Sequence, residues 1–132
     1  MKALKANVTR AISTGTMLEC ADNTGAKKLG LISVMGYHGK KGRLGRTGVG
    51  DVIICSVKKG TKKWRKQVVK ALIIRQKKEY RRANGIRIKF EDNAAIIVNE
   101  KTEPQGSQIK GPVAREVTDR FLTIGKIASF VV

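Results

Sequence analysis

Lysine and arginine are the most numerous chemically functional side chains of this chain, and both can bind phosphate. Residues 58–89 contain 14 of these bases and a single acid, Glu79. Residues 90–132, by contrast, contain five bases and six acids. An evenly solvated surface would mix the two signs. A strongly basic segment in a chain of formal charge +18 is instead typical of a nucleic-acid-binding protein.

The candidate RNA-binding residues occupy a glycine-rich stretch at 38–51 and two basic segments at 58–67 and 75–90. Bases on loops and hairpins neutralise phosphates and fix position without reading sequence. Two interpretations of Trp64 are open: its ring rests on the domain surface, or it stacks on a base or ribose beside Arg65. The candidates are Lys40, Lys41, Arg43, Arg46, Lys59, Lys62, Lys63, Trp64, Arg65, Lys66, Arg75, Lys77, Lys78, Arg81, Arg82, Arg87 and Lys89.

The glycine-rich stretch 38–51 invites comparison with a nucleotide-binding loop. It lacks the Gly-Lys-Ser/Thr ending of a P-loop, and no helical pattern follows it. Its five glycines instead let the backbone bend and approach an RNA backbone closely. We therefore predict no mononucleotide site here.

Residues that could ligate a metal are few. Cys20 and Cys55 are the two cysteines and His38 is the sole histidine, too small a set for a four-ligand zinc site. Each cysteine lies in an apolar run and is expected to be a small buried thiol in a reducing compartment. A disulfide between them is the alternative, because strands of a barrel can lie close together.

The ten carboxylates are scattered and form no paired acid and base. Asp22, Asp51 and Asp92 each lie at an expected turn, where a hydrogen bond to nearby backbone explains them. We predict no enzyme activity, no cofactor, no metal and no small-molecule substrate. Because the chain lacks an apolar run of about 18–20 residues, and residues 1–15 do not read as a secretory signal, we expect no membrane partner and a cytoplasmic location.

The hairpin expected within residues 70–98 must position many of these bases. Its apolar ends at 71–74 and 94–98 are anchored in a core, and Asn84-Gly85 predicts a type I′ turn at its tip. On the return leg alternate side chains point to opposite faces, so one face can pack and the other carries charge. The two sets are Ile86, Ile88 and Phe90, and Arg87 and Lys89.

Four further strands are expected, at 17–21, 28–37, 51–57 and 68–74. Together with 94–98 they predict a mainly β fold, a small five-stranded β-barrel with a protruding basic β-ribbon and two short C-terminal helices. The basic arms at 58–67 and 75–90 are the expected protrusions. In residues 1–15, Val8 and Ile12 are spaced for a short helical turn.

The first C-terminal helix is expected from Pro112 to Phe121, with Gly111 near its cap. Glu116 and Arg120 can pair one turn apart on its surface.

A second helix, Ile124–Ser129 with Thr123 as its cap, should follow and end in an apolar tail. The chain then reads as a single domain, 1–132, long enough for one modest core. Its parts are an N-terminal extension 1–15, the barrel with basic arms 16–99, and the C-terminal helical piece 111–132.

One spacing pattern carries a family resemblance. It runs from Ala71 through three branched aliphatics and nine residues to Asn84-Gly85, and then through Phe90 and Asn93 to Ile96-Ile97. Further blocks lie at 21–27, 48–51, 111–113 and 115–116. The chain closely resembles the ribosomal large-subunit protein L-fourteen family over nearly its whole length, with Ile96 where valine would be usual. Residues 1–15 and 121–132 are similar to the archaeal branch.

The resemblance implies a fold and a set of partners. The fold is a five-stranded barrel with a protruding β-ribbon and short C-terminal helices. The function is that of a structural constituent of the large ribosomal subunit, bound to large-subunit ribosomal RNA at the subunit interface. The further partners implied are small-subunit ribosomal RNA reached through a bridge, neighbouring large-subunit proteins, and assembly or anti-association factors.

A free single-strand-binding barrel is the alternative function. Such a protein stacks successive bases on several aromatic rings of one sheet face. The first hundred residues contain four aromatic residues, and the expected place of the last one in the core argues against this alternative. They are Tyr37, Trp64, Tyr80 and Phe90.

Charge also predicts a division of labour, with the basic middle facing RNA and the C-terminal piece facing protein. The arm bases are expected to lack acid partners and to need an external anion, whereas Glu116 and Asp119 would be repelled by phosphates. Charge reversal of Lys62, Lys63 and Arg65 should therefore weaken RNA binding far more than neutralising those two acids.

Overall fold

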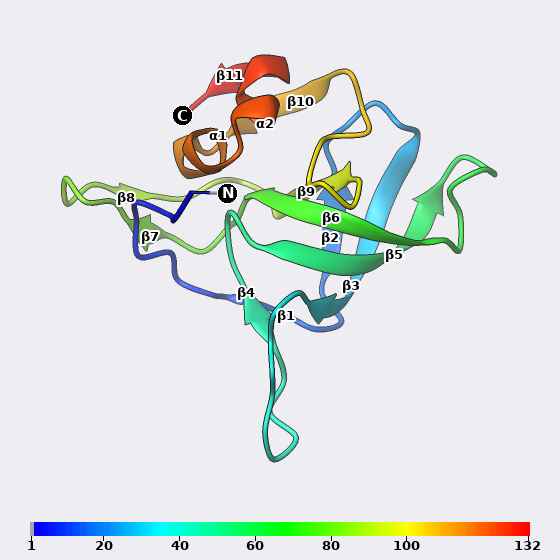
Figure 1. Ribbon diagram of the computed structural model, residues 1–132, viewed down its shortest axis with the longest axis horizontal. Helices are drawn as coiled ribbons and strands as arrows, with labels where there is room; N and C mark the ends of the chain where they lie inside the picture. Colours follow the sequence, from blue (N-terminus) through cyan, green and yellow to red (C-terminus); the bar gives the residue numbers. More distant parts are fainter. Residues whose placement is uncertain (1) are drawn as a thin grey trace.

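Five strands close into a barrel in the computed structural model, which describes residues 2–132 (Figure 1). Four of the strand pairs are antiparallel, and a parallel pair between the first and last strands closes the ring. The expected mainly β class and five-stranded barrel are therefore confirmed. The barrel strands, in the order of the ring, are β2 (Met17–Cys20), β3 (Ala26–Val34), β5 (Val52–Gly60), β6 (Val68–Arg75) and β9 (Ala94–Val98).

The core lies inside this barrel and beneath the C-terminal piece. The apolar ends of the 70–98 segment are its centre, since residues 71–74 and 94–98 are each at most 2% exposed. Such strands are buried on both faces, so they read as continuous apolar runs rather than as alternating ones. The outer face of this pair is covered by the chain after residue 99, through backbone hydrogen bonds from Gln105 to Ile97 and from Ala114 to Ile74.

The ribbon between the two apolar runs is short, with β7 (Tyr80–Arg81) paired to β8 (Arg87–Ile88). Its tip is a tight turn at Asn84-Gly85, but not the expected type I′ turn. Gly85 has φ +85°, Asn84 does not have a positive φ, and the Gly85 amide donates to the Arg82 carbonyl over 2.9 Å. The Arg82 amide also donates to Ile86, so the loop has three residues and needs a left-handed residue only at Gly85.

The two faces of the return leg differ less sharply than expected. Ile88 and Phe90 are partly buried and pack against the core. Ile86 is 56% exposed, because it lies at the tip beyond the reach of the barrel.

The N-terminal extension is extended rather than helical. Its β1 (Ile12–Ser13) pairs with β4 (Arg46–Thr47), and Asn7 forms an antiparallel bridge with Arg81 of the ribbon. A single helical turn is costly to nucleate, whereas this path gains cross-strand partners. The expected helical turn at Val8 and Ile12 is wrong for this reason.

The C-terminal piece contains two short helices, α1 (Arg115–Arg120) and α2 (Leu122–Ile127), flanked by two strands. These strands, β10 (Ile109–Val113) and β11 (Ala128–Val131), pair in parallel, which places Pro112 opposite Phe130. The first helix therefore starts three residues after the predicted Pro112. Pro112 has no amide proton to donate and is tolerated in this short strand.

The second helix also starts earlier than expected. Phe121 alone separates the two helices and caps both, and Thr123 lies inside α2 instead of capping it. The chain after Ile127 belongs to β11, so the predicted helix end at Ser129 is wrong as well.

Candidate nucleic-acid interface

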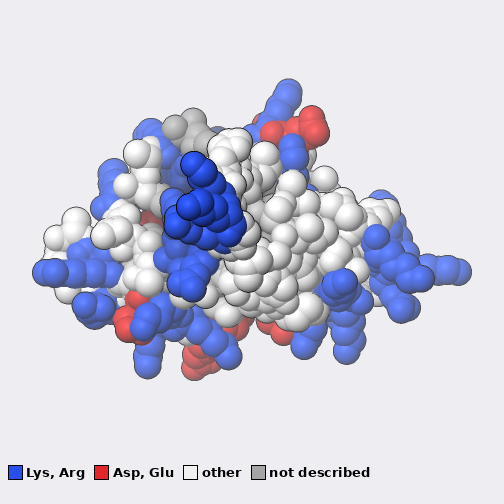
Figure 2. Space-filling view, turned by 90° about the horizontal axis from the view of Figure 1, so that it is seen from below, with Lys and Arg blue, Asp and Glu red and all other residues white. Residues whose placement is uncertain are grey.

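Three basic projections leave the barrel. We call them the glycine loop (residues 36–46, which follows β3 and ends at the first residue of β4), the β5–β6 arm (residues 58–67, which begins in the last turn-side residues of β5) and the ribbon (residues 77–89). Figure 1 shows the ribbon at the left, the arm at the right and the glycine loop at the bottom. In the view from below, basic side chains gather at both ends and on the loop that points towards the viewer (Figure 2). The exposed candidate bases are thus spread over three separate tips.

The glycine loop is shaped by its own contacts. The Tyr37 hydroxyl donates to the Arg43 carbonyl over 3.1 Å, and a β-carbon at Gly39 would lie 2.7 Å from the Tyr37 ring. Gly42 has φ +70°, a conformation that favours glycine. The predicted residues Lys40, Lys41, Arg43 and Arg46 are all exposed.

The β5–β6 arm is held by a chain of backbone hydrogen bonds. The amide of Thr61 donates to Gly25, and the Thr61 carbonyl accepts from the Trp64 and Arg65 amides at 3.0 and 3.1 Å. Trp64 packs against the core with the buried part of its side chain, and the rest of the side chain is accessible to solvent. The predicted bases Lys59, Lys62, Lys63, Arg65 and Lys66 are exposed around it.

The ribbon carries the remaining exposed candidates. Lys78 is the one exposed candidate with an ion pair among residues 2–132, at 2.9 Å from Glu79. The exposed predicted bases of the ribbon are Lys77, Lys78, Arg81, Arg87 and Lys89.

Arg75 is a predicted RNA-binding residue that the fold uses internally. It is 8% exposed, and its Nε and Nη2 donate to the two Asp92 oxygens over 2.6 and 3.0 Å. Its Nη1 donates to the carbonyls of Lys110 and Pro112. The guanidinium lies 3.1 Å from the position of a β-carbon at Gly111, so only glycine fits there without a shift. Arg75 fastens the base of the ribbon to β10 instead of facing outwards.

Arg82 is the second predicted base with an internal role. Its Nε donates to Glu116 Oε1 over 2.6 Å, and its Nη2 donates to Glu116 Oε2 and to the Val132 carbonyl. The Tyr80 hydroxyl donates to Glu116 Oε2 over 2.7 Å. We call Tyr80, Arg82 and Glu116 the ribbon clamp, because it joins the ribbon to helix α1 and to the end of the chain.

The ribbon clamp corrects two expectations. Arm bases were expected to lack acid partners, yet Arg75 and Arg82 both have one. Glu116 does not pair with Arg120, whose Nη1 donates instead to the Gly50 carbonyl over 3.1 Å. In both cases the partner lies far away in the sequence, where local spacing could not reveal it.

The ribbon clamp also shifts the pKa values of Glu116 and Tyr80. Burial tends to raise the pKa of Glu116, but hydrogen bonds from Arg82 and Tyr80 and the charge of Arg82 outweigh it, so the pKa is lowered. Burial, with the neighbouring Glu116 carboxylate, raises the pKa of Tyr80 well above its usual value. The carboxylate is thus held ionised and the phenol neutral at physiological pH.

The other aspartates behave largely as expected. Asp22 accepts from the Thr24 amide over 3.1 Å and from the Ile97 amide over 2.8 Å. Asp51 accepts from the Gly48 amide over 3.1 Å. Asp92 differs, since it pairs with the Arg75 side chain rather than with backbone.

The cysteines are both free thiols, so the structure contains no Cys20–Cys55 disulfide. Burial raises the pKa of each thiol to about 12, which keeps both in the unreactive protonated form. Within residues 2–132, no group of three or more His, Cys, Asp and Glu side chains could hold a metal ion. Over the same residues, no helix has the length and apolar character needed to cross a membrane.

Sequence reasoning missed that the N-terminal segment adds Lys5 to three of the predicted bases. The N-terminal segment runs beside the ribbon, so that Lys5 and Asn7 line a pocket of about 510 Å³ with Arg81, Arg82 and Arg87. The bridge between Asn7 and Arg81 creates this neighbourhood, and no local sequence signal announces it.

Comparison with known proteins gives a consistent result. The family model described as ribosomal protein L14p/L23e matches residues 11–132. A large ribosomal subunit protein uL14 from Methanothrix thermoacetophila is 58% identical over 129 residues, which cover 98% of this chain and 96% of that protein. The uL14 proteins of Methanocella arvoryzae and Halorubrum lacusprofundi are 52% and 53% identical over 132 residues, with complete coverage of both chains. These similar proteins come from archaea.

Proposed function

The chain belongs to the L14p/L23e family of ribosomal proteins, and from that premise we propose that its three basic projections bind large-subunit ribosomal RNA. Its role is structural, in the large ribosomal subunit, and no catalytic step is part of the proposal. Its place is accordingly the cytoplasmic ribosome.

The observation that supports the RNA-binding proposal is that the exposed candidate bases have almost no acid partners. Fourteen predicted bases are exposed on the glycine loop, the β5–β6 arm and the ribbon. Among residues 2–132, Lys78 alone of these has an acid partner. Unpaired bases on projecting tips attract phosphates and release counterions when they bind them. We leave Arg75 and Arg82 out of the proposed interface, because both are committed to internal partners.

The arrangement of the tips also supports a position between RNA segments. The projections leave the barrel in different directions (Figure 1), so one molecule can contact several separate phosphate backbones. We propose that it lies at the subunit interface and contributes to a bridge with small-subunit ribosomal RNA. Neighbouring ribosomal proteins, together with assembly or anti-association factors, are the proposed protein partners.

The alternative of a free single-strand-binding barrel is disfavoured by the aromatic side chains. Tyr80 is fully buried, and Phe90 packs partly against the core. Tyr37 and Trp64 lie on different projections, so they cannot form the continuous stacking platform that such proteins use.

Co-sedimentation tests the proposed function. The protein should remain with the large subunit through a high-salt wash, and the isolated protein should bind folded large-subunit RNA more tightly than an unstructured single strand. Loss from the subunit during the wash, together with equal affinity for both RNAs, would count against a structural ribosomal role and in favour of the free-binding alternative.

A further inference from the structure

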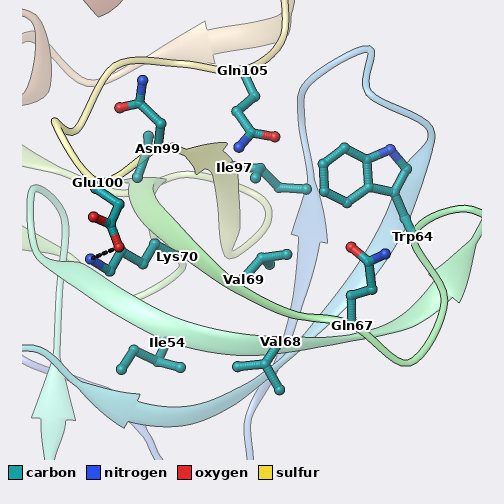
Figure 3. A pocket seen from close by; sticks show the side chains of 11 residues that line it. Ile54, Trp64, Gln67, Val68, Val69, Lys70, Ile97, Asn99, Glu100 and Gln105 are labelled. Atoms are coloured by element: carbon teal, nitrogen blue, oxygen red, sulfur yellow. Dashed lines mark ion pairs between the residues drawn. The ribbon is translucent and has the colours of Figure 1, made fainter.

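A groove of about 580 Å³ lies on the outside of the barrel beside the β5–β6 arm (Figure 3). Its floor is apolar, formed by Ile54, Val69 and Ile97 from three neighbouring strands. Its far wall is the loop after β9, residues 99–105. The volume is within the range of sites that take small organic groups. We call this the Trp64 groove.

Trp64 forms the near wall of the groove; its backbone is hydrogen-bonded within the arm, and its side chain is partly buried against the core. The Trp64 amide donates to Thr61, and its carbonyl accepts from the Gln67 amide over 3.2 Å. The Lys63 ammonium lies 5.9 Å from the ring centroid. The indole therefore supplies an electron-rich surface, and the flexible Lys63 side chain that lies over the ring can move to pair with a phosphate when a base stacks there.

Two side-chain amides extend into the groove from opposite sides, Gln67 from the arm and Gln105 from the loop (Figure 3). Within residues 2–132 neither amide group has a hydrogen-bond partner. Asn99 is different, because its amide is used by Glu103 and by the backbone of its own loop. A free amide offers one donor edge and one acceptor edge, which matches the mixed edge of a nucleobase.

The charges around the groove favour an anionic occupant. Lys62, Lys63 and Arg65 are exposed on the arm beside it, and they have no acid partner within residues 2–132. The acid of the groove, Glu100, lies 3.6 Å from Lys70, so its charge is compensated. A planar group with polar edges and an attached phosphate fits this combination better than an apolar peptide side chain does.

We propose that the Trp64 groove binds one unstacked base of a single-stranded or bulged RNA segment. The base lies against Trp64, its edge bonds to Gln67 and Gln105, and its phosphate is neutralised by the arm bases. This inference rests on the proposed function and deepens it. The arm would thereby hold a flipped-out nucleotide in addition to contacting the phosphate backbone.

Trp64 is the only tryptophan of the chain, so its fluorescence reports on the groove directly. The probes are a short oligoadenylate and an abasic chain of the same length with the same phosphates. The oligoadenylate should quench the fluorescence and bind on the order of tenfold to a hundredfold more tightly than the abasic chain, the usual effect of stacking a base on an aromatic ring. Equal affinity and equal quenching by both chains would overturn the proposal.

Variants test the two amides without disturbing the tryptophan. The double change Gln67→Ala and Gln105→Ala should weaken oligoadenylate binding severalfold and leave the abasic chain unaffected. Gln108→Ala is the matched control, an exposed glutamine outside the groove. If the double variant binds as the control does, or if an apolar peptide quenches and nucleotides do not, the groove does not hold a base.

The outcomes also separate this inference from the function on which it rests. A wild-type protein that fails to bind large-subunit RNA at all would refute the proposed function. A protein that binds this RNA with normal salt dependence, yet does not distinguish the oligoadenylate from the abasic chain, refutes only the Trp64 groove.

Discussion

Glu116 is the residue on which the attachment of the ribbon depends. Its carboxylate accepts from Tyr80 and from two nitrogens of Arg82, and its own side chain is 7% exposed. A buried ion pair is often no more stabilising than an apolar pair of similar volume, but the loss of one partner leaves an uncompensated buried charge. The consequence of changing Glu116 is therefore much larger than its helix-surface position suggested.

Glu116→Gln should destabilise the protein by about 1–3 kcal/mol, because the partly buried Arg82 guanidinium then loses its counter-ion. Urea denaturation monitored by Trp64 fluorescence gives the measurement. Glu91→Gln is the control, since Glu91 is exposed and has no ion pair within the described residues. Equal midpoints for the two variants would mean that the clamp contributes no stability.

The pH dependence of stability should report the same carboxylate. The pKa of Glu116 is lower in the folded protein than its reference value of 4.5. Between the lowered pKa of the folded protein and 4.5, the unfolded chain therefore binds more protons than the folded protein does, and the free energy of unfolding rises with pH. The contribution of Glu116 is complete above about pH 4.5 and is lost as the pH falls through the lowered folded value. Glu116→Gln should flatten the dependence of the urea midpoint on pH in this acid range, and an unchanged slope would contradict the assignment.

At the scale of the elements, the ribbon turn depends on backbone conformation more than on packing. Gly85 has φ +85°, and a β-carbon there would meet nothing closer than an Arg81 nitrogen at 3.9 Å. Substitution at Gly85 thus introduces backbone strain without a steric clash.

Gly85→Val should strain the ribbon turn by about 1–3 kcal/mol, the usual cost of a left-handed conformation in a residue that resists it. The backbone amides of residues 82 and 85 close the turn, and their hydrogen exchange should be faster in the variant than in the wild-type protein. Ala83→Val adds a similar side chain to the same loop at a residue without positive φ. Comparable exchange in both variants would show that the left-handed residue is not what the turn requires.

The elements also show which parts of the structure could be predicted from sequence. Each barrel strand has an apolar run bounded by turn residues, and such local patterns were sufficient to place all five. The start of α1 was wrong because β10 pairs with β11 far along the chain, which holds Pro112 in a strand. The path of the N-terminal segment was missed because its partner, Arg81, is distant in sequence.

Charge alone was enough to identify most of the exposed bases of the candidate interface, but not to recognise the bases that have internal partners. Fourteen of the predicted bases are exposed on projections, as a solvated or phosphate-bound base must be. Arg75 and Arg82 could not be told apart from them, because their acid partners lie 17 and 34 positions away. That residues 1–132 form a single domain stays a prediction.

At the scale of the whole molecule, the formal charge of +18 opposes compactness in the absence of a polyanion. The ion pairs of the described residues do not relieve this repulsion at the tips, since most of them lie on the barrel or at the ribbon base. RNA is thus an electrostatic partner for the tips in particular.

The expected separation between a basic middle that faces RNA and a C-terminal piece that faces protein needs one correction, which concerns Glu116. Neutralising Asp119 should still have little effect on RNA binding, whereas neutralising Glu116 should loosen the ribbon.

Position of charge, rather than total charge, should therefore govern RNA affinity. Replacing Lys62, Lys63 and Arg65 with alanine removes three bases from the β5–β6 arm. Each phosphate contact lowers log K by roughly 0.7–0.9 per unit of log salt, so the slope should fall by about 2–3 if all three bases contact phosphates. Binding to large-subunit RNA, measured by filter retention over a series of salt concentrations, gives both the affinity and the slope.

The control for that experiment removes the same charge from the C-terminal piece instead of from the arm. Lys110, Arg115 and Lys126 are exposed on the C-terminal piece and have no ion pair within the described residues. Their replacement by alanine gives a protein of identical net charge with an intact arm. This control should retain the wild-type slope, because bases that do not meet phosphates release no counterions. Equal losses from the two triple variants would show that the protein acts as a diffuse cation, and the proposed interface would have to be abandoned.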